Sequence, residues 1–103
     1  MADVKFSQIQ YNFMMKYTPE NNMFTSSSEI ETIKNIFCLD QLPDVHKAKM
    51  RNEIVRFYTK LMDKEILFDA TGEYKGHTDK YWPYMYAMQS ITMVFDYSIY
   101  KQI

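Results

Sequence analysis

Residues 43–64 read PDVHKAKMRNEIVRFYTKLMDK and contain the clearest helical pattern in the chain. Apolar side chains recur there at spacings of four, three and four, which places them on one face of an α-helix. These side chains belong to Met50, Ile54, Phe57 and Leu61. Pro43 suits the first turn of such a helix, and Asp44 favours the positive end of its dipole. The stretch therefore predicts a long helix that packs its apolar face on a core.

Two shorter helices are expected before this stretch. Residues 4–17 carry apolar side chains at helical spacing, and Asp3 precedes them as an N-cap. Apolar side chains also alternate in the same residues, so a β-strand stays open as the second interpretation, although we favour the helix. Ser28 and Glu31 have the spacing of a capping box, which predicts a helix from about Ser28 to Cys38.

A small hairpin and a last helix are expected after the long helix. Residues 66–68 form a short apolar run suited to a strand, and residues 69–76 hold both glycines of the chain, which indicates a turn. Thr78 or Asp79 can cap a helix over about residues 80–100, although alternation near the end of the chain keeps a strand open there too. The expected fold class is mainly α with a small β-hairpin, a compact domain of three to four helices.

The last segment is apolar on two opposite sides when it is drawn as a helix. One side carries Tyr84, Met88, Ile91, Phe95 and Ile99. The other side carries Tyr86, Met93, Tyr97 and Tyr100. A helix of this kind has to be covered on both sides. We expect the core to cover the first side, and a second copy of the chain or another partner to cover the second.

Two charged residues stand inside apolar patterns. Arg51 projects toward the apolar side of its helix, and Asp96 lies between Phe95 and Tyr97. A charge in such a place needs an opposite charge or a route to water. The sequence therefore suggests a structural ion pair between Arg51 and Asp96.

Residues 28–82 resemble a winged helix-turn-helix domain. The resemblance lies mainly in residues 54–67, IVRFYTKLMDKEIL, and in the glycine-containing residues 69–81 that would form the wing. Glu65 stands where the family usually has a corner glycine, and the segment before Ile54 is longer than in the compact motif.

The resemblance implies DNA binding through the exposed face of the long helix and through the wing. The implied contacts are Lys47, Lys49, Arg51, Asn52 and Arg56 on the helix, with Lys75, His77 and Lys80 on the wing. The same residues also read as an ordinary solvated helix face.

Length, charge and composition narrow the functional classes. The 103 residues suit a single domain over residues 1–103, and a net charge of −1 argues against binding nucleic acid mainly through phosphates. No signal peptide is evident, and the apolar stretch from Tyr81 to Tyr100 is a poor membrane span, so cytoplasmic residence is expected. The wealth of Met, Tyr, Asn, Lys and Ile is typical of AT-rich genomes, including many viral and phage genomes.

We expect no catalytic site, no metal and no cofactor. Cys38, His46 and His77 lack the spacing of a metal site, and the chain has no phosphate-binding glycine loop. Cys38 and His46 could form a nucleophile pair, but a lone cysteine at the end of an apolar helix reads better as a small buried hydrophobe.

The sequence therefore favours a small non-enzymatic binding module that acts as a regulator, inhibitor or adaptor. The partner would be another protein or a second copy of the chain, and neither a membrane nor a metal. The expected interface is the aromatic and Met-rich surface of the last segment, because these residue types are enriched at the centres of interfaces. It comprises Tyr81, Trp82, Tyr84, Tyr86, Met93, Tyr97 and Tyr100. The alternative is a winged-helix DNA-binding transcriptional regulator.

Overall fold

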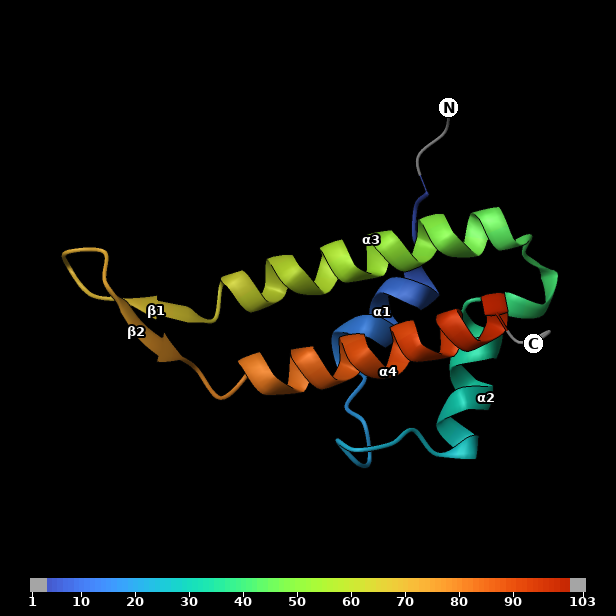
Figure 1. The fold of residues 1–103 in the computed structure, drawn as a ribbon, viewed down its shortest axis with the longest axis horizontal. Helices are drawn as coiled ribbons and strands as arrows, with labels where there is room; N and C mark the ends of the chain where they lie inside the picture. The colour runs from blue at the N-terminus through green and yellow to red at the C-terminus, as the bar shows by residue number, and fades with distance from the viewer. Residues whose placement is uncertain (1–3, 101–103) are drawn as a thin grey trace.

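The computed structural model describes residues 4–100, which form four α-helices, one 3-10 turn and one β-hairpin (Figure 1). The expected mainly α fold with a small hairpin is confirmed. In chain order the elements are α1 (Gln8–Lys16), α2 (Ser27–Ile36), η1 (Leu39–Gln41), α3 (Asp44–Asp63), β1 (Ile66–Phe68), β2 (Tyr74–His77) and α4 (Tyr81–Tyr100).

The two longest helices, α3 and α4, form the frame of the molecule. Each has 20 residues, and they lie side by side in opposite directions with the hairpin joining them at one end (Figure 1). The shorter helices α1 and α2 pack on this pair. The hairpin projects beyond the helices, which contributes to overall dimensions of 49 × 36 × 28 Å.

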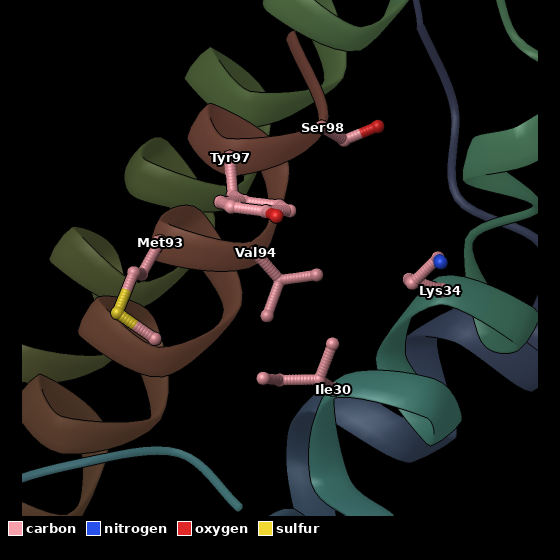
Figure 2. A pocket seen from close by; sticks show the side chains of 6 residues that line it. All are labelled: Ile30, Lys34, Met93, Val94, Tyr97 and Ser98. Atoms are coloured by element: carbon pink, nitrogen blue, oxygen red, sulfur yellow. The ribbon is translucent and has the colours of Figure 1, made fainter. Parts of the chain in front are cut away.

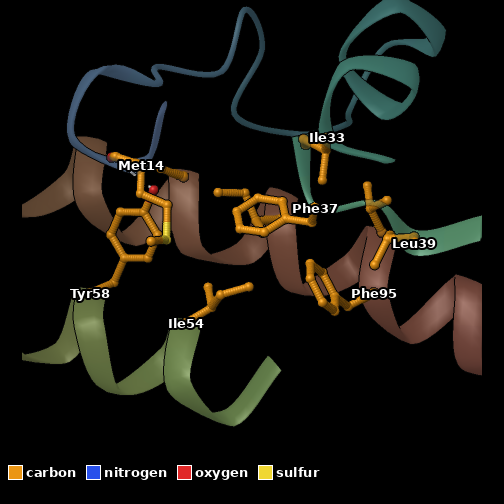
Figure 3. Close-up of a cluster of buried hydrophobic side chains, with 10 residues drawn as sticks. Met14, Ile33, Phe37, Leu39, Ile54, Tyr58 and Phe95 are labelled. Carbon is orange, nitrogen blue, oxygen red and sulfur yellow. Dashed lines mark hydrogen bonds between the residues drawn. The ribbon is translucent and has the colours of Figure 1, made fainter. Parts of the chain in front are cut away.

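The core lies where all four helices meet (Figure 3). Phe37 is at its centre, since its ring makes edge-on contacts with the rings of Phe6, Phe13 and Phe95 at centroid distances of 6.4, 6.1 and 5.3 Å. Ile54 from the predicted apolar face is fully buried. The buried cluster consists of Met14, Ile33, Phe37, Leu39, Ile54, Tyr58, Ala87, Ile91, Val94 and Phe95.

The helical interpretations of both ends of the chain are correct, and the strand alternatives are wrong. Helix α1 begins later than expected, because Ser7 caps it: the Ser7 hydroxyl accepts from the Gln10 N–H at 3.1 Å, and Gln10 accepts from the Ser7 N–H at 3.0 Å. The expected cap, Asp3, lies outside the described residues. The N-cap position of α4 is Lys80, not the expected Thr78 or Asp79; the Thr78 hydroxyl accepts from the Lys80 N–H at 3.3 Å in the turn before the helix.

The capping box of α2 is Ser26 with Glu29, not Ser28 with Glu31. Both pairs have the required spacing, but Glu29 is buried and accepts hydrogen bonds from outside the helix. The Tyr17 hydroxyl donates to it at 2.7 Å and the Glu20 N–H at 3.2 Å. These contacts with the preceding loop select the register, which the spacing alone could not do.

The end of α2 also differs from the expectation. The helix stops at Ile36, and Phe37 enters the core in place of Cys38. Cys38 has a left-handed backbone (φ 55°) that turns the chain into η1, and its side chain is exposed. Its expected role as a buried hydrophobe is therefore wrong.

The hairpin loop is stabilised from within. The Asp69 carboxylate accepts from the N–H groups of Thr71 and Glu73 at 2.8 and 3.0 Å and from the Thr71 hydroxyl at 2.6 Å. These bonds, chiefly that from the hydroxyl, hold the pKa of Asp69 below its ordinary value. Gly72 lies in the same turn with φ 86°, a conformation that side chains other than glycine rarely adopt.

Arg51 and Asp96 form the expected ion pair between α3 and α4. The Arg51 guanidinium donates through Nε to Asp96 Oδ1 at 2.6 Å and through Nη2 to Oδ2 at 3.2 Å. This two-point geometry fixes the rotation of one long helix against the other.

The buried Glu29 predicts a pH-dependent stability. Burial alone raises the pKa of this carboxyl, but the bonds from Tyr17 and the Ser26 and Glu20 N–H groups outweigh burial and lower it. A lowered folded-state pKa adds stability above the unfolded-state value and loses it as the pH falls through the folded-state value. We expect Glu29→Gln to lower the free energy of unfolding by about 1–3 kcal/mol at neutral pH and by less near pH 3, measured by urea denaturation. The matched control, Glu31→Gln on the exposed side of α2, should change neither value; equal losses at both pH values for Glu29→Gln would refute the assignment.

The Arg51–Asp96 pair predicts coupling in a double-mutant cycle. Both side chains keep about a third of their surface or more in solvent, at 35% and 41% exposure. We therefore expect a coupling energy of about 0.5–1 kcal/mol for the alanine variants in thermal or urea unfolding. The looser Glu53–Arg56 pair, at 3.9 Å, serves as the comparison and should couple less. Additive losses at Arg51 and Asp96 would show that the pair contributes nothing.

Candidate docking surface

The second apolar side of α4 is not covered by the rest of the described chain. Met93, Tyr97 and Tyr100 have exposed fractions of 46%, 72% and 62%, whereas Ile91 and Phe95 on the opposite side are fully buried. Met93 and Tyr97 are one turn apart, and Tyr100 follows a turn later, so they form one stripe along the helix. The fourth residue expected on this side, Tyr86, is half-buried.

A groove runs between this stripe and α2 (Figure 2). It has a volume of about 340 Å³. Val94 forms its floor, Met93 and Tyr97 stand on the α4 side, and Ile30 and Lys34 face them from α2. We call this feature the α2–α4 groove; its lining residues are Ile30, Lys34, Met93, Val94, Tyr97 and Ser98.

The apolar surface continues past Met93 toward the loop that precedes α2. Met93 also lines a second hollow of about 150 Å³, together with Met23 and Phe24 of that loop. Met23 is 89% exposed and Phe24 is 61% exposed. The docking surface therefore consists of the α2–α4 groove and these two loop residues.

Among the described residues, Lys34 is the one charged side chain that lines the α2–α4 groove. Its ammonium lies 4.0 Å from the Asp40 carboxylate, at the outer limit of an ion pair, and Asp40 is well exposed. A surface pair of this length contributes little. Lys34 is thus available to an acidic group of a partner, while the remainder of the groove suits apolar side chains.

The other expected interface residues do not line the α2–α4 groove, although Tyr86 lines the hollow beside Met23 and Phe24. Tyr84 was expected in the interface, but it packs against the core, and its ring centroid lies 6.5 Å from that of Tyr58. Tyr81 stacks on His77 at 4.5 Å near the hairpin. Trp82 stacks on Tyr86 at 5.8 Å in the same part of α4.

Sequence reasoning missed the residues that other segments contribute to the docking surface. Ile30 and Lys34 come from α2, which the sequence places in no relation to α4. Met23 and Phe24 carried a readable signal, because two large apolar residues stand together in an otherwise polar loop.

The DNA contacts that the winged-helix resemblance implies lie in different surroundings in the structure. Lys47 is buried and pairs with Asp44 at 3.5 Å, and Arg51 is engaged by Asp96. Lys75 pairs with Asp69 at 3.7 Å in the hairpin. His77 stacks on Tyr81, as described above. The exposed members are Lys49, Asn52 and Arg56 on α3, Lys75 on the hairpin and Lys80 before α4.

The described part of the chain offers few groups for other chemistry. Within residues 4–100, no three His, Cys, Asp or Glu side chains gather as metal ligands would. Cys38 and His46 are both at the surface. Over the same residues, no helix has the length and apolar character that crossing a membrane requires.

No protein-family model, curated protein or solved structure matches the chain. The docking surface and its chemistry are therefore the basis for assigning a function.

The exposure difference along α4 predicts opposite effects of two alanine substitutions. Tyr97→Ala should change the free energy of unfolding by no more than about 0.5 kcal/mol, because its ring stabilises little in the free chain. Phe95→Ala should cost about 3–5 kcal/mol, because it empties a fully buried site. Urea denaturation of the two variants measures both. A loss at Tyr97 as large as that at Phe95 would place Tyr97 in the fold and not in an interface.

Proposed function

We propose that the protein is a small non-enzymatic binding module, a regulator, inhibitor or adaptor that docks on another protein molecule through the docking surface. The observation that carries this proposal is the uncovered stripe of Met93, Tyr97 and Tyr100 beside an apolar groove. Side chains of these types are favoured at the centre of interfaces, where they exclude water over a large area. We also propose cytoplasmic residence for the module.

The groove suits an apolar helix laid between α2 and α4. Helix-in-groove recognition places side chains three and four residues apart in a row of hollows. Met93 separates two such hollows here, the α2–α4 groove and the hollow beside Met23 and Phe24. A partner with apolar side chains at that spacing and an acidic side chain near Lys34 would satisfy the surface.

A second copy of the chain is the simplest partner. A two-fold contact brings the same surface from both copies together, so that each stripe on α4 is covered by its counterpart. Helix α2 also carries Glu31 one turn before Lys34, and both face away from the core. A two-fold arrangement therefore allows the acid of one copy to meet the cation of the other.

Light scattering after size exclusion tests this proposal. We expect a concentration-dependent dimer that becomes monomeric in the Met93→Glu/Tyr97→Glu variant, since two charges would be buried without partners. Tyr74→Glu is the matched control, because Tyr74 is a similarly exposed aromatic residue on the hairpin, and it should remain dimeric. A native chain that is monomeric at every concentration would rule out the second copy. If, in addition, no purified partner loses affinity on Tyr97→Ala, the docking proposal itself fails.

DNA binding through α3 is a second candidate, favoured by the exposed cations Lys49 and Arg56. Affinity for a DNA duplex should then fall steeply with salt, and more so in the native chain than in the Lys49→Gln/Arg56→Gln variant. Electrophoretic mobility shifts at several salt concentrations measure both. Docking through α4 predicts instead that Tyr97→Ala, and not these charge changes, abolishes binding.

A further inference from the structure

A third hollow lies on another part of the molecule, between α1 and α3. Its volume is about 390 Å³, within the range of sites that hold small ligands. It shares no lining residue with the α2–α4 groove. We call it the α1–α3 pocket.

Three aromatic rings, with Met15 and Leu61, form the apolar part of the α1–α3 pocket. The Phe57 ring stands between those of Phe6 and Tyr11, with edge-on contacts at 6.2 and 5.6 Å. Tyr11 is 45% exposed, so part of its ring is open to a bound molecule. Rings arranged in this way can receive a further flat ring by stacking or edge contact.

A row of cations borders the same rings. Arg56 and Lys60 on α3 and Lys64 at its C-cap follow one another at four-residue spacing, which places them on one side of the helix. Within residues 4–100, Glu53 is the one acidic residue in the lining, and its carboxylate lies 3.9 Å from the Arg56 guanidinium. Glu65, beyond the end of α3, is engaged by the Thr78 hydroxyl.

Within residues 4–100, the ammonium groups of Lys60 and Lys64 have no counter-charge. Neither side chain makes a hydrogen bond or ion pair there, and the neighbouring Asp63 makes no ion pair with them. The facing helix α1 contains no acidic residue and ends in Lys16. Like charges four residues apart on a helix repel one another. An anion bound in the pocket would remove this repulsion.

We infer that the α1–α3 pocket binds an aromatic anion of nucleotide size, a flat ring that carries a phosphate. The ring contacts Tyr11 and Phe57, and the phosphate lies against Lys60 and Lys64. Each half of the ligand matches one half of the pocket: stacking needs the open aromatic face, and a phosphate needs clustered cations. The source is a free nucleotide or one unit of a single-stranded nucleic acid.

Isothermal titration with four probes tests the site. Adenosine monophosphate carries ring and charge, adenosine the ring alone, and inorganic phosphate the charge alone. We expect adenosine monophosphate to bind at least about tenfold more tightly than either part, because both halves of the pocket are then used. A thymidine decamer separates the sources: a nucleic-acid site binds it more tightly than the monophosphate, and a nucleotide site does not. Either order of these two affinities supports binding in the pocket.

Substitutions locate the binding. Lys60→Gln/Lys64→Gln should weaken adenosine monophosphate about tenfold, and Tyr11→Ala by roughly five- to a hundredfold. Lys75→Gln on the hairpin is the matched control, because Lys75 lines neither the groove nor the pocket, and it should leave affinity within about twofold. The substituted lysines are exposed, so circular dichroism should show native folding. Equal affinity for inorganic phosphate, or no effect of the lysine substitutions, would overturn the assignment.

Discussion

The packing of α3 against α4 is the contact on which the other features of the molecule depend. Two helices of 20 residues, each roughly 30 Å long, share one apolar seam, and the Arg51–Asp96 pair sets their rotation. Helices α1 and α2 have 9 and 10 residues, too few to cover the remaining length of both. Because α1 and α2 are short, two surfaces that could bind a partner or ligand stay open: the apolar docking surface beside α4 and the cationic pocket beside α3.

Much of the fold could be predicted from the sequence because its strongest signals are local. The spacing of apolar residues around Ile54 defines α3, and the misplaced charges of Arg51 and Asp96 reveal which helices meet. The exact ends of the helices were harder to predict from the sequence. The capping register of α2 depends on the hydroxyl of Tyr17, which approaches Glu29 from the end of the preceding helix, α1. A local pattern contains no information about such a contact, and for the same reason the exposure of Cys38 could not be foreseen.

The candidate site was predictable only in the half that lies on α4. A helical wheel places Met93, Tyr97 and Tyr100 opposite the core, and burial agrees with that placement. The same wheel places Tyr84 on the side that faces the core, and the structure agrees with the wheel and not with the inclusion of Tyr84 in the expected interface. The contribution of α2 depends on how η1 turns the chain back toward α3. That turn follows from the left-handed backbone of Cys38, a residue type that carries no signal for it.

The hairpin between α3 and α4 is a place where a label can be attached outside both surfaces. Its loop is held by the carboxylate of Asp69, and neither the docking surface nor the α1–α3 pocket includes any residue of it. The loop also projects away from the helices. A fluorophore or a short epitope inserted beside Gly72 would therefore report on the protein in solution or in cells without touching either surface.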